Sequence, residues 1–326
     1  MKYLVTGGAG FIGSHIARHL AMQGEDVTVL DNFSTGKHAN INDLPVTLIE
    51  GDIVDASCVR EAVKDVDIVF HQAALCSVER SMKDPTSTHL VNATGTLNVL
   101  EACRQEGVRR VMFASSSSVY GNTQILPKDE KMIPSPISPY AISKLIGELY
   151  CKAYWEQFGL ETVALRYFNV FGPRQDVGSD YAAVIPKFAD ALLSGKMPTI
   201  YGDGEQTRDF TYVENVVQAN IAASQARFAA GSVINVACGE RCGLLKLLLL
   251  IENILDMDVP PVFMEPRQGD VKHSLASIDV AEKLLGYRPQ VGLEDGLRST
   301  IEWYVENINQ GQSTSRSEIP IASGQS

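Results

Sequence analysis

Short apolar runs alternate with amphipathic stretches through the first half of the chain. Apolar runs of four to eight residues fit strands buried on both faces, and the stretches between them carry helical periodicity. Strict alternation of this kind predicts a doubly wound parallel sheet with helices on both faces, an α/β fold. The expected strands are residues 2–6, 27–31, 46–50, 67–72, 110–115 and 162–170, with helices following Gly13 up to Gly24, at 55–64 and at 90–106.

The alternation of strand-like and helix-like segments ends after Pro173, where Gly, Asp and Tyr become frequent. The later pattern predicts a strand at 233–237 and helices near 182–195, 213–227, 244–256, 279–285 and 293–308. We expect a cofactor domain at 1–172 and a smaller α/β substrate-binding lobe at 173–310, partly interleaved with the first. The Gly-, Ser- and Gln-rich tail at 311–326 is expected to be disordered.

The net charge of the chain limits the classes of partner that it is expected to bind. The chain of 326 residues has a formal net charge of −11, which argues against nucleic acid and against anionic membranes. Its longest apolar stretch, Leu244 to Ile251, is interrupted by Lys246 and too short to span a bilayer, and the N-terminus does not read as a secretory signal. The six cysteines are scattered, which favours reduced thiols, a cytoplasmic protein and no metal.

A glycine motif follows the first expected strand and opens the first expected helix. TGGAGFIG places Gly7, Gly10 and Gly13 three apart, and Gly8 completes a second G-x-G-x-x-G match. Glycines permit a tight turn and let backbone amides approach a pyrophosphate, which the helix N-terminus also attracts. Because strand, glycine turn, helix and next strand all occur in order, the sequence predicts a Rossmann-like dinucleotide site.

Carboxylates and small residues follow the next strands. Asp31 ends the second strand, where a carboxylate can accept hydrogen bonds from both ribose hydroxyls and would repel a 2′-phosphate. This favours NAD over NADP. Asp52 can face the adenine, and Ala73 and Ala74 leave room for the cofactor beside the backbone.

The segment SPYAISK suggests the reacting group. Pro139 suits a first helical turn with Ser138 as its cap, so Tyr140 and Lys144 share one helix face. A lysine and a positively charged nicotinamide would lower the pKa of the phenol, which could then remove a proton from a substrate hydroxyl. Serines 115–118 end the fifth strand, where ligands bind in such sheets. The competing interpretation of Tyr140 and Lys144 is a surface turn.

Over residues 1–308 the chain resembles the extended short-chain dehydrogenase/reductases, through TGGAGFIG, SSSSVYG and YAISK. Within that family, RYFNVFGPRQD, YAAVIPKF, GDGEQTRDFTYV and RQGDVKHS look most like UDP-hexose 4-epimerases, closest to the UDP-N-acetylglucosamine type. The resemblance implies NAD as cofactor, a UDP-sugar as substrate and a homodimer that pairs through helices near 92–106 and 141–157.

The resemblance also assigns site residues. Its catalytic residues are Tyr140 as base, Lys144 as partner of the base and Ser116 as proton relay. Its cofactor contacts are Gly7, Gly10, Phe11, Ile12, Gly13, Asp31, Asn32, Asp52, Ile53, Ala73, Ala74, Asn92, Tyr140, Lys144 and Tyr167. Its substrate contacts are Ser77, Ser116, Ser117, Asn169, Val184, Tyr201, Arg208, Arg267, Asp270 and Ser274. Arg208 and Arg267 would clamp the diphosphate, as two arginines suit a dianion.

Two departures refine the expected reaction. The related dehydratases carry Asp-Glu directly after the relay hydroxyl and the decarboxylases keep the Glu, whereas this chain has Ser117 and Ser118. Elimination then lacks its acid–base group, which leaves epimerisation at C4. In the epimerases a bulky residue at the position of Ser274 narrows the sugar pocket, so the small serine predicts that N-acetylated sugars are accepted.

The sequence therefore predicts NAD-dependent C4 epimerisation that favours UDP-GlcNAc and UDP-GalNAc and leaves UDP-Glc and UDP-Gal open as a second pair. One alternative is a UDP-glucuronate 4-epimerase, which needs a cation near the sugar C6; Arg80 is the one candidate that we identify. The other alternative is a non-catalytic NAD-binding sensor.

Overall fold

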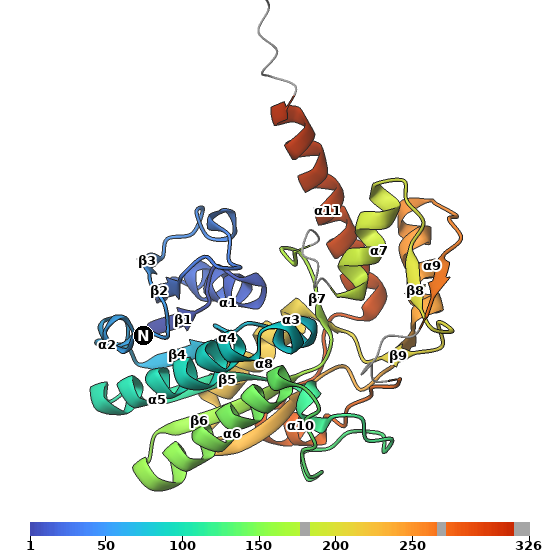
Figure 1. Cartoon of the computed structure of the whole chain (residues 1–326). Helices are drawn as coiled ribbons and strands as arrows, with labels where there is room; N and C mark the ends of the chain where they lie inside the picture. The colour runs from blue at the N-terminus through green and yellow to red at the C-terminus, as the bar shows by residue number, and fades with distance from the viewer. Residues whose placement is uncertain (177–182, 266–271, 316–326) are drawn as a thin grey trace, which may run out of the picture.

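The computed structural model describes residues 1–176, 183–265 and 272–315. A seven-stranded sheet lies at its centre, with strand order β3-β2-β1-β4-β5-β6-β11 and every neighbouring pair parallel (Figure 1). The strands are β1 (Lys2–Thr6), β2 (Asp26–Asp31), β3 (Thr47–Glu50), β4 (Ile68–His71), β5 (Arg110–Ser116), β6 (Glu161–Tyr167) and β11 (Ser232–Val236). This confirms the predicted doubly wound α/β sheet.

Helices cover both faces of the sheet. One face carries α2 (Ala56–Ala62), α5 (Gly95–Glu106) and α6 (Pro139–Phe158), and the other carries α1 (Phe11–Met22), α8 (Val213–Gln225) and α10 (Asp279–Leu285). Leu4 points into the first layer and Val5 into the second, as successive residues of a strand must, and both are fully buried. Burial of such side chains stabilises the fold by roughly 1.5–3 kcal/mol each.

Helix α6 has strong sequence signals at both ends. Ser138 accepts a hydrogen bond from the Ala141 amide at 3.2 Å, and Pro139 occupies the first turn. Gly159 ends the helix in the left-handed region at φ 74°. These caps fix the bounds of α6 and thereby place Tyr140 and Lys144 directly beside the carboxyl end of β5.

The last strand of the sheet, β11, comes from the second half of the chain. The edge strand β11 pairs with β6, with Asn235 opposite Arg166, and α8 and α10 pack beneath it. These elements come from beyond residue 172, so the second half of the sequence contributes to both parts of the molecule. The predicted strand at 162–170 is divided: β6 ends at Tyr167, and β7 starts at Val170 after Asn169, whose φ is 34°.

A smaller lobe lies beside the carboxyl edge of the sheet (Figure 1). Its core joins Phe171, Phe188, Leu247 and Ile301. Its helices are α7 (Val184–Leu193), α9 (Leu244–Leu255) and α11 (Leu293–Ser315). Its short strands pair as β7 (Val170–Phe171) with β10 (Thr211–Tyr212), β8 (Thr199–Tyr201) with β13 (Val262–Met264), and β9 (Thr207–Arg208) with β12 (Cys242–Gly243).

The remaining differences concern helix bounds. The helix expected at 90–106 is preceded by α3 (Val78–Lys83) and α4 (Pro85–His89) and includes a π-helical segment η2 (Leu90–Thr94) before α5. Short turns η1 (His38–Asn40) and η3 (Ser117–Tyr120) were not predicted. The tail expected to be disordered from 311 is helical up to Ser315, where α11 ends, and 316–326 lie outside the described residues. No helix in the described part of the chain has both the length and the apolar character to cross a bilayer.

Candidate active site at the carboxyl edge of the sheet

The glycine turn forms a close-packed cradle. Gly7 has φ 67°, and a Cβ there would lie 2.7 Å from the backbone nitrogen of Ala73. A Cβ on Gly13 would lie 2.1 Å from the Gly7 carbonyl oxygen, so neither position admits a side chain. Gly10 caps α1, with Phe11 and Ile12 in its first turn. The helix end and the open glycine backbone fit the pyrophosphate of a dinucleotide.

Asp31 supports the same turn. Its carboxylate accepts hydrogen bonds from the amides of Ala9 at 2.9 Å and Phe33 at 2.8 Å, and the residue is 7% exposed. A carboxylate has about four acceptor positions, so two amides leave capacity for ribose hydroxyls. Asn32 donates to Asp52 at 2.8 Å, which brings the ends of β2 and β3 together. Ile53, also predicted to contact the cofactor, is buried beside Gly95.

The loop after β4 is held by Asn92. Its side-chain oxygen accepts from the Leu75 amide at 2.8 Å, and its amide nitrogen donates to the Leu75 carbonyl at 3.2 Å and to Ser143 at 3.0 Å. Ala73 donates its amide to Thr6 at 3.3 Å, and Ala74 continues this loop. Asn92 thus ties the loop to α6 and shapes the cofactor side of the site from the π-helical segment.

Tyr167 lies in a polar cluster that the sequence did not reveal. Its hydroxyl is within hydrogen-bond distance of Gln72 (3.1 Å to Nε2) and Asn220 (2.9 Å to Nδ2). Burial raises the pKa of Tyr167 to about 12, so it stays protonated. Gln72 directly follows β4 and Asn220 lies on α8, and only the folded sheet places them beside Tyr167.

Tyr140, Lys144 and Ser116 meet where α6 crosses the end of β5. The Lys144 ammonium donates to the Ala114 carbonyl at 2.7 Å and lies 6.0 Å from the centre of the Tyr140 ring. Burial raises the pKa of Tyr140, while its hydrogen bond with Ser116 acts in the opposite direction. Burial also lowers the pKa of Lys144. The lowering of the Tyr140 pKa that we expect from Lys144 together with a positively charged nicotinamide stays a prediction, because these shifts are those of the protein alone.

The neighbouring serines form a hydroxyl chain. Ser118 donates its amide (3.2 Å) and its hydroxyl (2.9 Å) to Ser116 Oγ, while Ser117 is the first residue of η3. Cys76 also faces Tyr140, and its nearby thiol contributes to the raised Tyr140 pKa. Cys76 was not among the predicted site residues.

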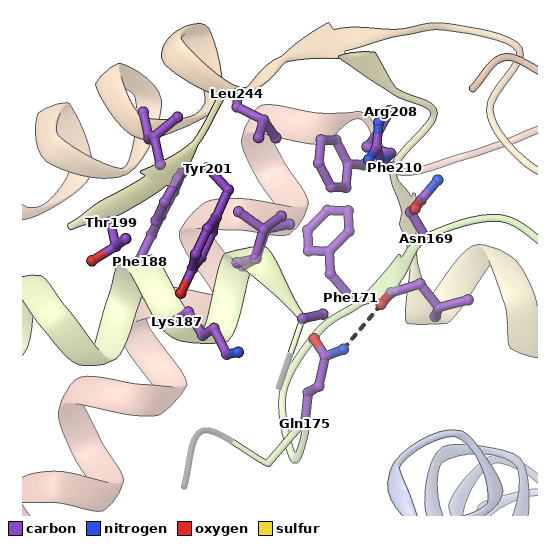
Figure 2. A pocket seen from close by; sticks show the side chains of 15 residues that line it. Asn169, Phe171, Gln175, Lys187, Phe188, Thr199, Tyr201, Arg208, Phe210 and Leu244 are labelled. Atoms are coloured by element: carbon purple, nitrogen blue, oxygen red, sulfur yellow. Dashed lines mark hydrogen bonds between the residues drawn. The ribbon is translucent and has the colours of Figure 1, made fainter. Parts of the chain in front are cut away.

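A cavity of about 270 Å³ lies in the smaller lobe. Four predicted substrate residues line it, namely Asn169, Val184, Tyr201 and Arg208. Figure 2 shows Arg208 and Asn169 toward one end, and Tyr201 with Lys187 toward the other. Lys187 was not predicted, although it shares the α7 face of Val184 and Phe188 by helical spacing. Two cations line this cavity in a chain whose net charge is −11.

Ser274 adjoins the cavity through Asn169, which donates to its hydroxyl at 3.1 Å. Arg208 is held by the carbonyls of Thr207 at 3.0 Å and Lys272 at 3.1 Å. Two further predicted substrate residues, Arg267 and Asp270, lie outside the described residues. Ser77 does not line the cavity but caps α3, where it accepts from the Arg80 amide at 3.0 Å. No cluster of three metal-ligating side chains occurs in the part of the chain that the structure describes.

The fold and the glycine cradle define the dinucleotide-binding class of α/β proteins, here with a separate cavity lined by Lys187 and Arg208. A family model described as "NAD dependent epimerase/dehydratase family" matches residues 3–237. A putative UDP-glucose 4-epimerase of Methanocaldococcus jannaschii is 39% identical over 93% of this chain and 98% of its own length. A UDP-N-acetyl-alpha-D-glucosaminuronate decarboxylase of Bacillus cytotoxicus is 36% identical over 94% and 99%.

Solved structures agree. A UDP-N-acetylglucosamine 4-epimerase of Methanobrevibacter ruminantium, in complex with UDP-N-acetylmuramic acid, is 43% identical with a TM-score of 0.90, over 94% of this chain and 98% of that one. A UDP-glucuronic acid 4-epimerase of Bacillus cereus, bound to UDP-glucuronic acid and NAD, is 34% identical with a TM-score of 0.88, over 94% and 100%. The chain belongs to the NAD dependent epimerase/dehydratase family: it is an enzyme of the UDP-sugar epimerase/dehydratase kind, with NAD as its cofactor. The predicted family and cofactor are confirmed.

Proposed function

We propose that the enzyme inverts C4 of UDP-hexoses, favouring UDP-GlcNAc and UDP-GalNAc, with UDP-Glc and UDP-Gal as a second pair. The observation that carries this proposal is the pairing of Tyr140 with Ser116 at the end of β5, next to serines rather than carboxylates at 117 and 118. This set can move one proton at a sugar hydroxyl but has no acid for elimination at those two positions.

The side chains support a reversible oxidation at C4. NAD, when bound, supplies the hydride acceptor and donor, so no net oxidation occurs. Tyr140 takes the proton of the 4-hydroxyl and later returns it. Ser116 hydrogen-bonds the same oxygen, and Lys144 brings a positive charge that stabilises the phenolate. Lys144 is 2% exposed and Tyr140 is half-buried, so the moving proton has limited contact with water.

Glu148, a buried acid close to this strand end, is already engaged. Glu148 lies one helical turn beyond Lys144 and is 4% exposed. It is bound by both Arg166, at 2.7 and 2.8 Å, and the hydroxyl of Ser115. Because its oxygens are occupied by these partners, Glu148 does not replace the acid that dehydratases and decarboxylases need. This favours epimerisation over the activity named for the Bacillus cytotoxicus relative.

The pocket supports a nucleotide diphosphate sugar. Arg208 can bind phosphate oxygens at one end, and the Tyr201 ring suits a planar base at the other. Ser274 is small and already beside Asn169, which leaves room for an N-acetyl group. The similarity to a UDP-N-acetylglucosamine 4-epimerase points the same way.

A UDP-glucuronate 4-epimerase remains the second candidate because of the similarity to the Bacillus cereus enzyme. Its substrate carries a carboxylate at C6 that calls for a cation. Arg80, on α3, was the sequence candidate, and its backbone amide binds Ser77 in the loop after Cys76. UDP-glucuronate is therefore included in the assay below.

We also propose a cytoplasmic homodimer that pairs through α5 and α6, as the family resemblance suggests. Ile142 and Leu149 stand seven residues apart on α6 and are 47% and 59% exposed. Leu90, on the neighbouring helical segment η2, is 45% exposed, and Met82 on α3 is 63% exposed. A cluster of apolar side chains on adjoining helices is typical of an interaction surface.

The test replaces Tyr140 by Phe and measures turnover of UDP-GlcNAc, UDP-Glc and UDP-glucuronate. We expect kcat to fall by about 10²–10⁴-fold for the preferred sugar, because the proton acceptor is lost, while the sugar nucleotide still binds. Tyr150→Phe, on the same helix, is the control and retains turnover. A wild type that binds NAD but turns over none of the sugars supports the sensor instead.

A further inference from the structure

Asp209 is a fully buried carboxyl directly after Arg208. Its oxygens accept three backbone hydrogen bonds, from Cys238 at 2.9 Å, Gly239 at 3.1 Å and Ala276 at 3.1 Å. These donors belong to the loop after β11 and to the segment that follows Ser274. One side chain thus holds together three stretches of chain that are distant in sequence.

The stretch of Asp209 itself borders the substrate cavity, which its neighbours Arg208 and Phe210 line. The Asp209 carbonyl accepts from Asn169 at 3.0 Å, and its amide donates to Ser274 at 3.4 Å. Ser274 in turn donates its amide to the Thr207 carbonyl at 3.0 Å. The positions of Asn169, Arg208 and Ser274 therefore depend on the local structure that the Asp209 carboxylate fixes, although the carboxylate itself does not line the cavity.

We infer that Asp209 is a positioning residue of the substrate site: its ionised carboxylate sets Arg208, Asn169 and Ser274 for the sugar nucleotide, and its protonation weakens substrate binding without affecting the proton transfer at Tyr140. This inference rests on the proposed function. An ionised carboxylate accepts amide hydrogen bonds at both oxygens, whereas a carboxylic acid presents a hydroxyl at one of them. Protonation therefore costs at least one of the three bonds.

Burial raises the pKa of Asp209 to about 6, opposed by the three amides and reinforced by Glu240. Among the described residues, the titratable and charged groups on the segments packed around it include Arg208, Cys238, Glu240, Arg241, Lys272, His273 and Tyr287. Affinity should be complete above about pH 6 and fall as the pH drops through that value. This places a proton-sensitive step in substrate binding at the edge of the physiological range.

Stability responds to the same proton in the opposite direction. The carboxyl has a higher pKa in the folded protein than in the unfolded chain, so the folded protein binds the proton more tightly. The contribution of Asp209 to stability therefore increases as pH falls from about 6 toward the unfolded value of about 4. Acid weakens binding through Asp209 but does not unfold the protein through it.

The experiment measures Kd for UDP-GlcNAc and steady-state kinetics of the NAD-loaded enzyme from about pH 5 to about pH 8. The diphosphate diester of UDP-GlcNAc does not titrate in this pH range, unlike the terminal phosphate of UDP. For wild type we expect Kd to rise as the pH falls below about 6, by as much as about tenfold per pH unit. Asp209→Asn should raise Kd about tenfold or more at neutral pH and remove the pH dependence, with kcat at saturation nearly unchanged.

Two controls separate Asp209 from its surroundings. His273→Gln removes the imidazole that lies 3.0 Å from Thr207 Oγ1, and Asp203→Asn removes an exposed carboxylate of the same segment. Both should keep the wild-type pH dependence. If His273→Gln abolishes it, or if Asp209→Asn retains it, the inference is overturned.

The outcomes also distinguish this inference from the proposed function. A wild type that neither binds nor converts UDP-sugars refutes both. A wild type that converts them with a Kd independent of pH refutes the role of Asp209 alone, and this holds even if Asp209→Asn does not fold. A proportional loss of kcat in Asp209→Asn with unchanged KM would likewise contradict a role in substrate binding.

Discussion

The Lys144 ammonium donates a hydrogen bond of 2.7 Å to the carbonyl oxygen of Ala114, two residues before Ser116. This bond joins α6, which carries Tyr140, to the end of β5, which carries the relay serine. One turn further along α6, Glu148 binds the hydroxyl of Ser115. The two halves of the proposed catalytic set are therefore fixed to each other by side chains that reach from the helix to the strand.

The buried pair of Arg166 and Glu148 should be critical for stability. Both side chains are less than 5% exposed, and a buried charge that loses its partner is destabilising by about 3–5 kcal/mol. We expect this loss of unfolding free energy for Arg166→Met, measured by urea denaturation. The double variant Arg166→Met with Glu148→Leu should recover much of it, because an apolar pair of similar volume carries no uncompensated charge.

The exposed pair of Arg18 and Asp43 provides the comparison. It is bidentate, at 2.7 and 2.9 Å, but Asp43 is largely exposed, so its loss should cost at most about 1 kcal/mol. If Arg166→Met were no more destabilising than Arg18→Met, the pair would not hold α6 against the sheet.

Gly7→Ala should abolish NAD binding. The new Cβ would meet the Ala73 backbone at 2.7 Å, in addition to the strain at φ 67°. Gly107→Ala has nearly the same φ, 72°, but its Cβ meets nothing within 4 Å. Gly107→Ala should cost only about 1 kcal/mol of stability and retain the cofactor. Absorbance and mass analysis of the purified proteins measure bound NAD, and equal retention in both variants would contradict the cradle.

Ser274→Tyr should change which sugars are accepted. A bulky ring beside Asn169 would fill the space proposed for the N-acetyl group. We expect kcat/KM for UDP-GlcNAc to fall at least about tenfold relative to UDP-Glc, because overpacking is costly in a confined site. Ser274→Ala, which adds no bulk, should preserve the ratio of the two substrates. An unchanged ratio in the tyrosine variant would place the N-acetyl group elsewhere.

Leu149→Glu should disrupt the proposed homodimer. The side chain is 59% exposed on α6, and a charge buried in an apolar interface is strongly disfavoured. Native mass measurement should show dimers for wild type and monomers for the variant. Met22→Glu, on the exposed face of α1 at 75% exposure, should leave the dimer intact. A wild type that is monomeric at micromolar concentration would contradict the proposal that this surface forms a homodimer.

Much of the fold was accessible from the sequence because its signals are local. Apolar runs, the glycine turn after β1 and the caps of α6 each depend on neighbouring residues. The sequence did not predict that α8 and β11 return to the sheet, since such pairing depends on contacts between distant segments. The division of the strand at 162–170 depends on the positive φ of Asn169, which no local sequence pattern predicted.

The residues of the candidate site likewise divide into those that local sequence patterns reveal and those that only the fold reveals. Motif residues such as Gly7, Tyr140 and Arg208 could be found by spacing and resemblance. Asp209, Gln72 and Asn220 could not, because their roles arise from partners brought together by the fold. The burial that raises the pKa of Tyr140 in the protein alone is also invisible in a sequence, and the lowering expected with a bound, positively charged nicotinamide stays a prediction.

The most direct test of the central claim is proton NMR of the purified protein with UDP-GlcNAc and no added cofactor. We predict that UDP-GalNAc appears and that the two sugars reach equilibrium without net consumption of NAD. If neither UDP-GlcNAc nor UDP-Glc changes even after NAD is supplied, C4 epimerisation of these sugars is contradicted. Turnover of UDP-glucuronate alone would assign the enzyme to the second candidate function.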